Sequence, residues 1–148
     1  MTRTDLDEVL DLEKEIFPSA WSRQAFEFEC RRPKGVSLIA EGDGRIVGYA
    51  IGWAVADELH IANLAVRPDW RRKGIGEALV KTLIRLCPDA EWAGLEVRAS
   101  NQPAMSLYSR LGFKATAVRK QYYVEEGEDA VVMEKELSEV RRGTHGLV

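Results

Sequence analysis

A strand, a loop, a helix and a second strand follow one another between residues 61 and 98, and this succession constrains the fold strongly. The segment Ile61–Val66 is mostly apolar and Trp92–Arg98 has alternating apolar positions, so both are predicted to be strands. Between them, apolar residues recur with a period of about 3.6, which predicts one helix face. These residues are Ile75, Leu79, Leu83 and Leu86. Because strand–helix–strand connections cross over right-handedly, the two strands are expected to lie parallel in one sheet.

The loop between the first strand and the helix combines positive charge with glycine. After a Pro68-Asp69 turn, it reads Arg71-Arg72-Lys73-Gly74-Ile75-Gly76. Glycine lets the backbone approach a ligand closely, and the free N–H groups and dipole of a first helical turn favour phosphate oxygens. A P-loop needs Gly-Lys followed by Ser or Thr, and a dinucleotide fingerprint needs a third glycine where Leu79 stands. The loop therefore predicts a polyanion site of another kind, with a merely solvated cationic surface as the alternative.

The remaining segments predict one α+β domain over residues 1–137 and a polar tail over residues 138–148. Further helices are predicted over residues 5–16, after an N-cap at Ser22, and from Ser100 to Leu111, which Gly112 closes. Further strands are predicted over residues 36–40, 46–56, 115–124 and 130–137. The resulting order is ααβββαβαββ, without repeats or a linker.

Composition narrows the class of protein. The chain has 148 residues and a net charge of −3, which argues against a general nucleic-acid-binding protein. Its longest nearly apolar run, residues 46–56, is too short to cross a bilayer, and its polar first residues predict no secretory signal. Cys30 and Cys87 lack the spacing of metal ligands and are interpreted as reduced thiols. We therefore expect a cytoplasmic protein that binds no metal, no nucleic acid and no membrane.

Further motifs surround the glycine loop and extend over almost the whole chain. They are Phe17-Pro18-x-x-Trp21-Ser22, Asn63-Leu64-Ala65-Val66, Leu95-Glu96-Val97-Arg98-Ala99-Ser100-Asn101, Leu107-Tyr108-x-x-Leu111-Gly112-Phe113, Arg119-Lys120-x-Tyr122-Tyr123 and Glu128-Asp129-Ala130. Together with Arg71-x-x-Gly74-x-Gly76, they resemble the GCN5-related N-acetyltransferase (GNAT) family over residues 5–137. Within this family the chain is similar to the ribosomal-protein alanine N-acetyltransferase (RimI) branch.

The resemblance implies a mixed, mainly antiparallel sheet, flanked by helices, whose central parallel strands splay apart to admit acetyl-CoA. By the family pattern, the backbone of Leu64, Ala65 and Val66 contacts the pantetheine arm and the thioester, and Asn101 also contacts the arm. The pyrophosphate would be held by Arg71, Arg72, Lys73, Gly74, Ile75, Gly76 and Glu77. The protein substrate would be contacted by Trp21, Glu58, Tyr122 and Tyr123, with cross-strand packing as the alternative for the two tyrosines.

Two positions depart from the family pattern. The family begins with a strand before its first helix, and only about three residues precede the helix predicted here. We therefore expect this strand to be short or absent. The branch has Pro before its Trp-Ser pair, where this chain has Ala20. That difference concerns the loop expected to line the peptide groove.

The expected reaction, attack of an amine on a thioester, needs a base and an acid. Glu96 lies mid-strand between apolar neighbours, where partial loss of hydration would make its carboxylate a stronger base. A surface pair of Glu96 with Arg98 or a lysine is the alternative. The resemblance makes Tyr108 the acid, against the alternative of a core tyrosine. His60 is either a second base or a packing histidine.

Three functions remain open at this level. The resemblance implies acetylation of a protein N-terminus, with Ala as the first residue, and a small-subunit ribosomal protein as partner. A small-amine acetyltransferase and a non-catalytic coenzyme A sensor are the alternatives. A Glu and a Tyr at the expected catalytic positions argue against a sensor, which needs neither. Oligomeric state is not predicted by any of these features.

Overall fold

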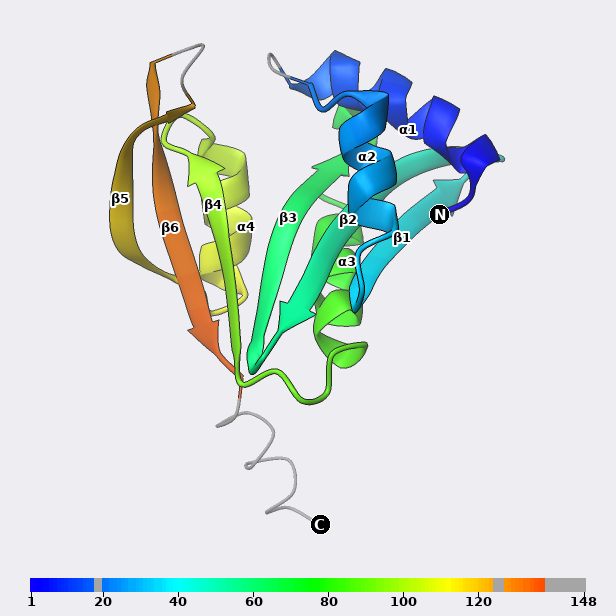
Figure 1. The fold of residues 1–148 in the computed structure, drawn as a ribbon. Coiled ribbons are helices and arrows are strands. Elements are labelled where there is room, and N and C mark those ends of the chain that lie inside the picture. The colour runs from blue at the N-terminus through cyan, green and yellow to red at the C-terminus, as the bar shows by residue number, and fades with distance from the viewer. Residues whose placement is uncertain (18–19, 124–126, 138–148) are drawn as a thin grey trace. The chain divides into compact units, whose positions relative to one another are not determined.

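The computed structural model describes residues 1–17, 20–123 and 127–137 and contains four α-helices and six strands in these ranges (Figure 1). The helices are α1 (Arg3–Ile16), α2 (Arg23–Cys30), α3 (Ile75–Arg85) and α4 (Gln102–Arg110), with a short 3-10 helix, η1 (Pro68–Trp70). The strands are β1 (Gly35–Gly42), β2 (Arg45–Val55), β3 (Glu58–Val66), β4 (Trp92–Arg98), β5 (Lys114–Tyr123) and β6 (Glu128–Glu136). This order of elements matches the predicted one, and none of the described helices is long and apolar enough to span a membrane.

The six strands form one sheet in the order β1-β2-β3-β4-β6-β5. Antiparallel pairing joins β1 to β2, β4 to β6, and β6 to β5. The strands β3 and β4, which α3 connects, are the parallel pair. The predicted mixed, mainly antiparallel sheet is therefore confirmed, and the crossover through α3 explains its parallel step.

Local side-chain chemistry explains where the helices begin. The hydroxyl of Thr2 accepts a hydrogen bond from the Asp5 backbone while the Asp5 carboxylate accepts one from Thr2, so α1 begins two residues earlier than predicted. The hydroxyl of Ser22 accepts a hydrogen bond of 3.1 Å from Ala25 N, which confirms the predicted cap of α2. The side chain of Asn101 caps α4 in the same way, at 3.2 Å from Ala104 N.

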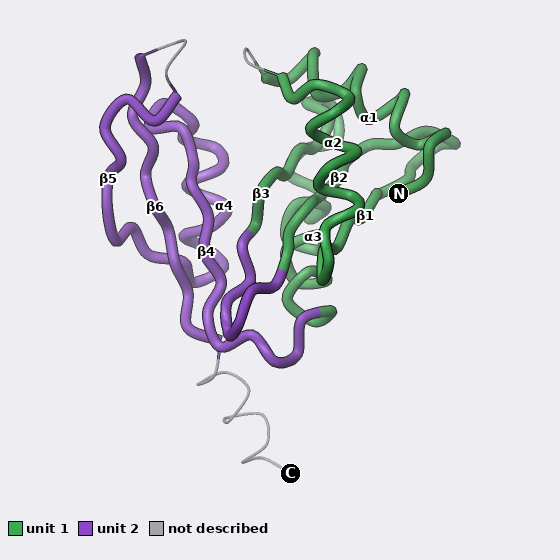
Figure 2. Tube along the Cα trace, in the orientation of Figure 1, with its two compact units in different colours: residues 1–53, 61–86 green, residues 54–60, 87–148 purple. Residues whose placement is uncertain are grey.

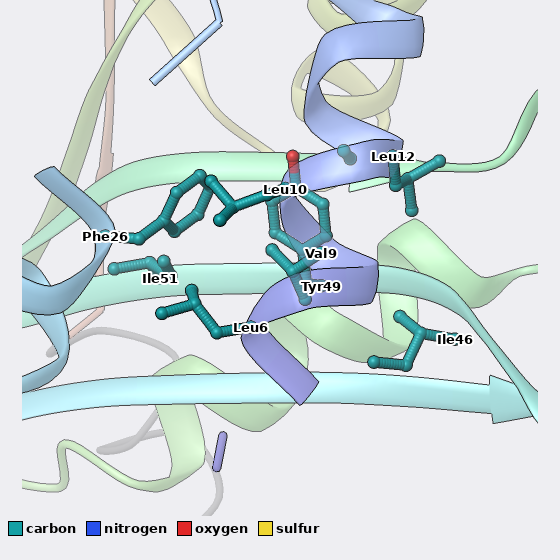
Figure 3. Packing of buried hydrophobic residues seen from close by; sticks show 9 residues of the cluster. Leu6, Val9, Leu10, Leu12, Phe26, Ile46, Tyr49 and Ile51 are labelled. Atoms are coloured by element: carbon teal, nitrogen blue, oxygen red, sulfur yellow. The ribbon is translucent and has the colours of Figure 1, made fainter. Parts of the chain in front are cut away.

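The chain divides into two compact units (Figure 2). Unit 1 comprises residues 1–53 and 61–86. Its apolar cluster joins residues of α1, α2, β2 and β3, and Figure 3 shows eight of them by name. The buried members are Leu6, Val9, Leu10, Leu12, Phe26, Ile46, Tyr49, Ile51 and Ala65. Removal of these side chains from water is the main force that holds the helices of this unit on the sheet.

Unit 2 comprises residues 54–60 and 87–148. Every second residue of β4 is buried, namely Ala93, Leu95 and Val97, so the intervening Glu96 lies on the opposite face of the strand. In contrast, the first nine residues of β5 are exposed, as expected for a strand at the sheet edge.

The prediction that Leu86 belongs to the apolar face of the helix is wrong. Leu79 and Leu83 of α3 are buried as predicted, but Leu86 is 53% exposed. The helix ends at Arg85, and Leu86 is its C-cap, so its side chain no longer follows the helical period. At the other end of the chain, Thr2 caps α1 directly, which confirms that the family's strand before the first helix is absent among the described residues.

Candidate active site

Glu96 lies on the face of β4 opposite the buried Ala93, Leu95 and Val97. Its side chain is only 15% exposed, and its Oε2 lies 2.8 Å from Nε2 of His60, at the start of β3. Its other oxygen, Oε1, lies 3.8 Å from the guanidinium of Arg119 on β5. All three residues belong to unit 2. A partly desolvated carboxylate with an imidazole on one side and a cation on the other is a chemically plausible proton acceptor.

The Glu96–Arg98 pair considered from the sequence is not what the structure shows. Arg98 lies 3.5 Å from the carboxylate of Glu128 instead, and its guanidinium is 4.0 Å from the ring centre of Tyr123. Sequence reasoning missed the contact between Glu96 and Arg119. Ala130 of β6 pairs with Arg98 on one side and with Arg119 on the other, so only the register of the hairpin reveals it.

Tyr108 is buried in unit 2, with 4% of its surface exposed. Its ring meets that of Phe113 edge to face, with the centroids 5.4 Å apart. Burial raises the pKa of the Tyr108 hydroxyl well above its ordinary value, so the group is protonated throughout the neutral pH range. Tyr108 therefore has the packing expected of a core tyrosine, and it also carries the proton that a general acid must donate.

Tyr122 and Tyr123 end β5 with their rings 5.2 Å apart and nearly perpendicular. Tyr122 is 44% exposed and lies under the guanidinium of Arg119, at 5.4 Å. Burial raises the pKa of Tyr123 to about 12, against the opposing effect of nearby Arg98. The preceding residue, Gln121, has φ +48, a backbone conformation that turns the strand end. An exposed Tyr122 beside a partly buried Tyr123, each with a guanidinium near its ring, is a surface suited to a peptide.

Two other predicted residues of unit 2 stand apart from these contacts. The Oδ1 atom of Asn101 is occupied in capping α4, which leaves its amide nitrogen for any contact with a coenzyme. Glu58 is exposed at the first position of β3, two residues before His60. Among the residues that the structure describes, no cluster of three or more His, Cys, Asp or Glu is arranged to hold a metal.

The predicted pyrophosphate loop lies in unit 1 and has the backbone of an anion site. Arg71, Arg72, Lys73 and Gly74 are all exposed. Gly74 has φ +81 with open space where a Cβ would stand, and Arg72 has φ +64, which non-glycine residues rarely adopt. The N-cap of α3, Gly74, has no side chain to accept a hydrogen bond from the first helical turn, whose N–H groups are the usual anion-binding groups of a helix. These features fit a diphosphate, because its charge matches both the cations and the helix dipole.

The strand that leads into this loop contains the other predicted coenzyme contacts. Ala65 is buried, while Leu64 and Val66 are partly exposed. The side-chain Nε of Arg71 donates to the carbonyl of Val66 at 3.2 Å, so this arginine ties the loop to the end of β3. Across from the strand, a Cβ on Gly48 would lie 2.9 Å from the Ala65 carbonyl, which explains glycine at that position.

Trp21, the predicted substrate contact of unit 1, is partly buried just before α2. Its ring lies 5.1 Å from that of Phe26, and its backbone nitrogen donates to the Glu13 carboxylate at 2.8 Å. Pro18, which belongs to the same motif, lies outside the described residues. The predicted site residues thus fall into a set in unit 1 and a set in unit 2.

Comparison with known proteins gives consistent similarities. Residues 6–113 match the family model described as the acetyltransferase (GNAT) family. A Bacillus subtilis (strain 168) protein, named as a candidate ribosomal protein bS18-alanine N-acetyltransferase, is 38% identical over 136 residues, 90% of each chain. The Salmonella typhimurium ribosomal protein bS18-alanine N-acetyltransferase is 35% identical over 140 residues, 90% of this chain and 92% of that protein.

A solved structure has the same fold. The crystal structure of the ribosomal-protein-S18-alanine N-acetyltransferase from Escherichia coli is similar to this chain with a TM-score of 0.81 and 33% sequence identity. The similarity covers 92% of this chain and 90% of that one.

Proposed function

The chain belongs to the GCN5-related N-acetyltransferase (GNAT) family, as its motifs predicted, and we propose that it acetylates the N-terminal α-amine of a protein. Enzymes of this family take the acetyl group from acetyl-CoA. The observation that carries the proposal is the partly buried Glu96 carboxylate, held 2.8 Å from His60 on the outward face of β4. Relatives at 35 and 38% identity are named as ribosomal protein bS18-alanine N-acetyltransferases, the latter as a candidate.

The proposed reaction is a direct transfer. Glu96, directly or through a water molecule, removes a proton from the substrate ammonium, and the neutral nitrogen attacks the thioester carbonyl carbon. The C–S bond then breaks while the nitrogen loses its second proton to solvent, which leaves an amide. Tyr108 gives its proton to the departing thiolate of coenzyme A and is reprotonated from solvent. No residue becomes acylated, so Cys30 and Cys87 have no role. His60 keeps the carboxylate oriented, and the raised pKa of Tyr108 keeps its proton available.

The strength of the base favours an α-amine over a lysine side chain. An α-amine has a pKa near 8, so about a tenth of it is neutral at pH 7, at a cost of roughly 1.4 kcal/mol. A lysine with a pKa near 10.4 would require roughly 4.6 kcal/mol to lose its proton. A single carboxylate hydrogen-bonded to one imidazole is suited to the smaller of these two costs.

Acetyl-CoA would be bound by the residues of unit 1. The backbone of Leu64, Ala65 and Val66 would contact the pantetheine arm. The exposed loop from Arg71 to Gly76 and the uncapped start of α3, including the Glu77 backbone, would hold the pyrophosphate. The side chain of Glu77 itself lies 2.8 Å from Lys81, so we assign only its N–H group to the ligand. In unit 2 the Asn101 amide would contact the arm.

The protein substrate would be bound by Trp21 in unit 1 and by Glu58, Tyr122 and Tyr123 in unit 2. Tyr122 supports this assignment, because a large aromatic side chain that is 44% exposed gains more from contact with a partner than from contact with water. We assign the substrate class as a small-subunit ribosomal protein with alanine as its first residue, and the relatives named as ribosomal protein bS18-alanine N-acetyltransferases support this assignment.

Mass spectrometry after incubation with acetyl-CoA tests the proposal. Two peptides share one basic sequence: the first has a free N-terminal Ala, and the second is blocked at its N-terminus and carries an internal Lys. We expect the free peptide alone to gain one acetyl group, and Glu96→Gln to abolish this gain. A parallel incubation with polyamines and aminoglycosides tests the small-amine alternative. Acetylation of those amines, or of neither peptide by a chain that binds acetyl-CoA, would refute an N-terminal acetyltransferase.

A further inference from the structure

Among the described residues, one charged side chain is buried: Glu13 on α1 is 1% exposed. It follows Leu12 in the chain and accepts a hydrogen bond from the Tyr49 hydroxyl. Leu12, Tyr49 and Phe26 belong to the apolar cluster of unit 1 (Figure 3). Transfer of a carboxylate from water into such surroundings is costly, and an apolar residue of similar volume is often at least as stable. Fold stability therefore does not explain a glutamate at this position.

The Glu13 carboxylate accepts three hydrogen bonds from three different segments. The Tyr49 hydroxyl of β2 and the Asn63 side-chain amide of β3 both donate to Oε1, the latter at 2.9 Å. The backbone N–H of Trp21 donates to Oε2 at 2.8 Å. No described cation lies within 4.0 Å of the carboxylate, so it acts as an acceptor for neutral donors. Burial and the Glu13 charge raise the pKa of Tyr49, so its hydroxyl remains a donor.

The two hydrogen bonds to Oε1 and the one to Oε2 differ in the segments that they hold in place. β3, with Asn63, is also held by its strand neighbours, and Tyr49 is fixed by the core. Trp21 lies outside any helix or strand, between α1 and α2. Its side chain packs beside the Phe26 ring against the apolar cluster, and its backbone nitrogen donates to the Glu13 carboxylate. The backbone position of Trp21 therefore depends on Glu13 more than the positions of Tyr49 and Asn63 do.

We infer that Glu13 is a positioning residue that holds the Trp21 backbone, and with it the segment before α2, in the conformation that receives the acceptor peptide. The inference rests on the proposed function for the role of Trp21 as a substrate contact. Glu13 itself touches neither substrate nor coenzyme. Its loss should therefore weaken peptide binding while leaving the chemistry and the coenzyme site intact.

The test compares three variants. Glu13→Met combined with Tyr49→Phe removes the carboxylate and the buried hydroxyl together, so the core stays apolar and folded. Tyr49→Phe alone is the matched control, because it removes one bond to Glu13 but not the bond to Trp21. Glu13→Gln is the conservative variant. Its amide oxygen can still accept from Trp21, while its amide nitrogen can donate to Tyr49 and to a rotated Asn63 amide.

We expect the double variant to raise the KM for the Ala-led peptide about tenfold, with kcat and the KM for acetyl-CoA almost unchanged. Tyr49→Phe and Glu13→Gln should keep the wild-type peptide KM. A double variant that folds and keeps this KM would overturn the inference, as would an equal rise in both KM values, which indicates general loss of structure.

Amide hydrogen exchange measures the same role without activity. The Trp21 amide should be protected in the wild type and in Glu13→Gln, and should exchange faster in the double variant, while the β2 amides do not change. Hydrogen exchange at Trp21 tests the positioning role of Glu13 separately from the proposed function, because it can be measured even if no peptide is acetylated. If the double variant does not fold, Glu13→Asp replaces it: the shorter side chain keeps the charge but cannot reach all three donors. Continued protection of Trp21 in the folded variant would refute the role.

Discussion

The Glu96 carboxylate of β4 and the His60 imidazole of β3 lie 2.8 Å apart, although 36 residues separate them in the chain. The pair is mostly shielded from water, since the Glu96 side chain is 15% exposed and that of His60 is 34% exposed. Such a contact orients the carboxylate and leaves its other oxygen toward Arg119. The same geometry would let a proton taken up by Glu96 be shared with the imidazole, which is useful in a general base.

Glu96→Gln should lower kcat about 10²–10⁴-fold, because the amide cannot accept the proton of the ammonium. Affinity for acetyl-CoA, measured by calorimetry, should not change. His60→Gln should cause a smaller loss. When Glu96→Gln and His60→Gln are combined, the two reductions in kcat should not add, because His60 acts through Glu96. Additive losses in steady-state kinetics would show that His60 acts independently of the carboxylate.

Tyr108→Phe should lower kcat while the thermal unfolding temperature stays close to that of the wild type. Phenylalanine keeps the edge-to-face contact with Phe113, so the packing around the ring is retained. We expect a loss of about 10²-fold, which is typical for removal of a general acid. Unchanged kcat with a thioester substrate would assign Tyr108 to the core alone.

Gly74→Ala should raise the KM for acetyl-CoA, and Gly44→Ala provides a matched control. Gly74 (φ +81) and Gly44 (φ +74) both have left-handed backbones and open space at the Cβ position. Each substitution should therefore cost a similar amount of stability, about 1 kcal/mol, without a steric clash. Only Gly74 belongs to the predicted pyrophosphate loop. Equal effects of the two variants on the KM for acetyl-CoA would contradict that assignment.

Tyr122→Ala should raise the KM for the peptide at least about fivefold, as expected when an aromatic contact of ~1 kcal/mol is lost. Val118→Ala is the control on the same strand, since Val118 is 55% exposed and Tyr122 is 44% exposed. The control should change the KM by less than about twofold. Both variants should keep the KM for acetyl-CoA, and identical peptide KM values would show that Tyr122 does not contact the substrate.

The stability of the fold should decrease in alkaline solution. Burial raises the pKa values of Tyr49 and Tyr108 above the ordinary tyrosine range, and that of Tyr123 to about 12. In the unfolded chain these hydroxyls lose their protons near pH 10, so their contribution is complete below about pH 10 and is lost above it. The near-ultraviolet absorbance of tyrosinate should report fewer ionised tyrosines at about pH 11 in the folded than in the denatured chain. Equal titration curves would contradict the burial of these hydroxyls.

Local sequence signals were sufficient for much of the fold. The caps at Ser22 and Asn101, the helix after Gly74 and the parallel strand pair all follow from residues close together in the chain. Each depends on a short-range cause, such as a side chain that reaches its own backbone or the handedness of one crossover. Leu86 shows where local signals were insufficient: the helical period placed it on the apolar face, but α3 ends at Arg85 and Leu86 is exposed.

The sequence by itself determined the family, and it predicted an anion loop and the residue types of the candidate site, because these depend on motifs of adjacent residues. Only the tertiary structure determined which oppositely charged side chains lie close to one another. Arg119 reaches Glu96 through the register of β4, β6 and β5, and Arg98 turns to Glu128. In the sequence Glu13 is one acidic residue among several in α1, and it becomes a buried acceptor only when β2, β3 and Trp21 pack around it. Contacts between residues far apart in the chain depend on packing, which no local pattern contains.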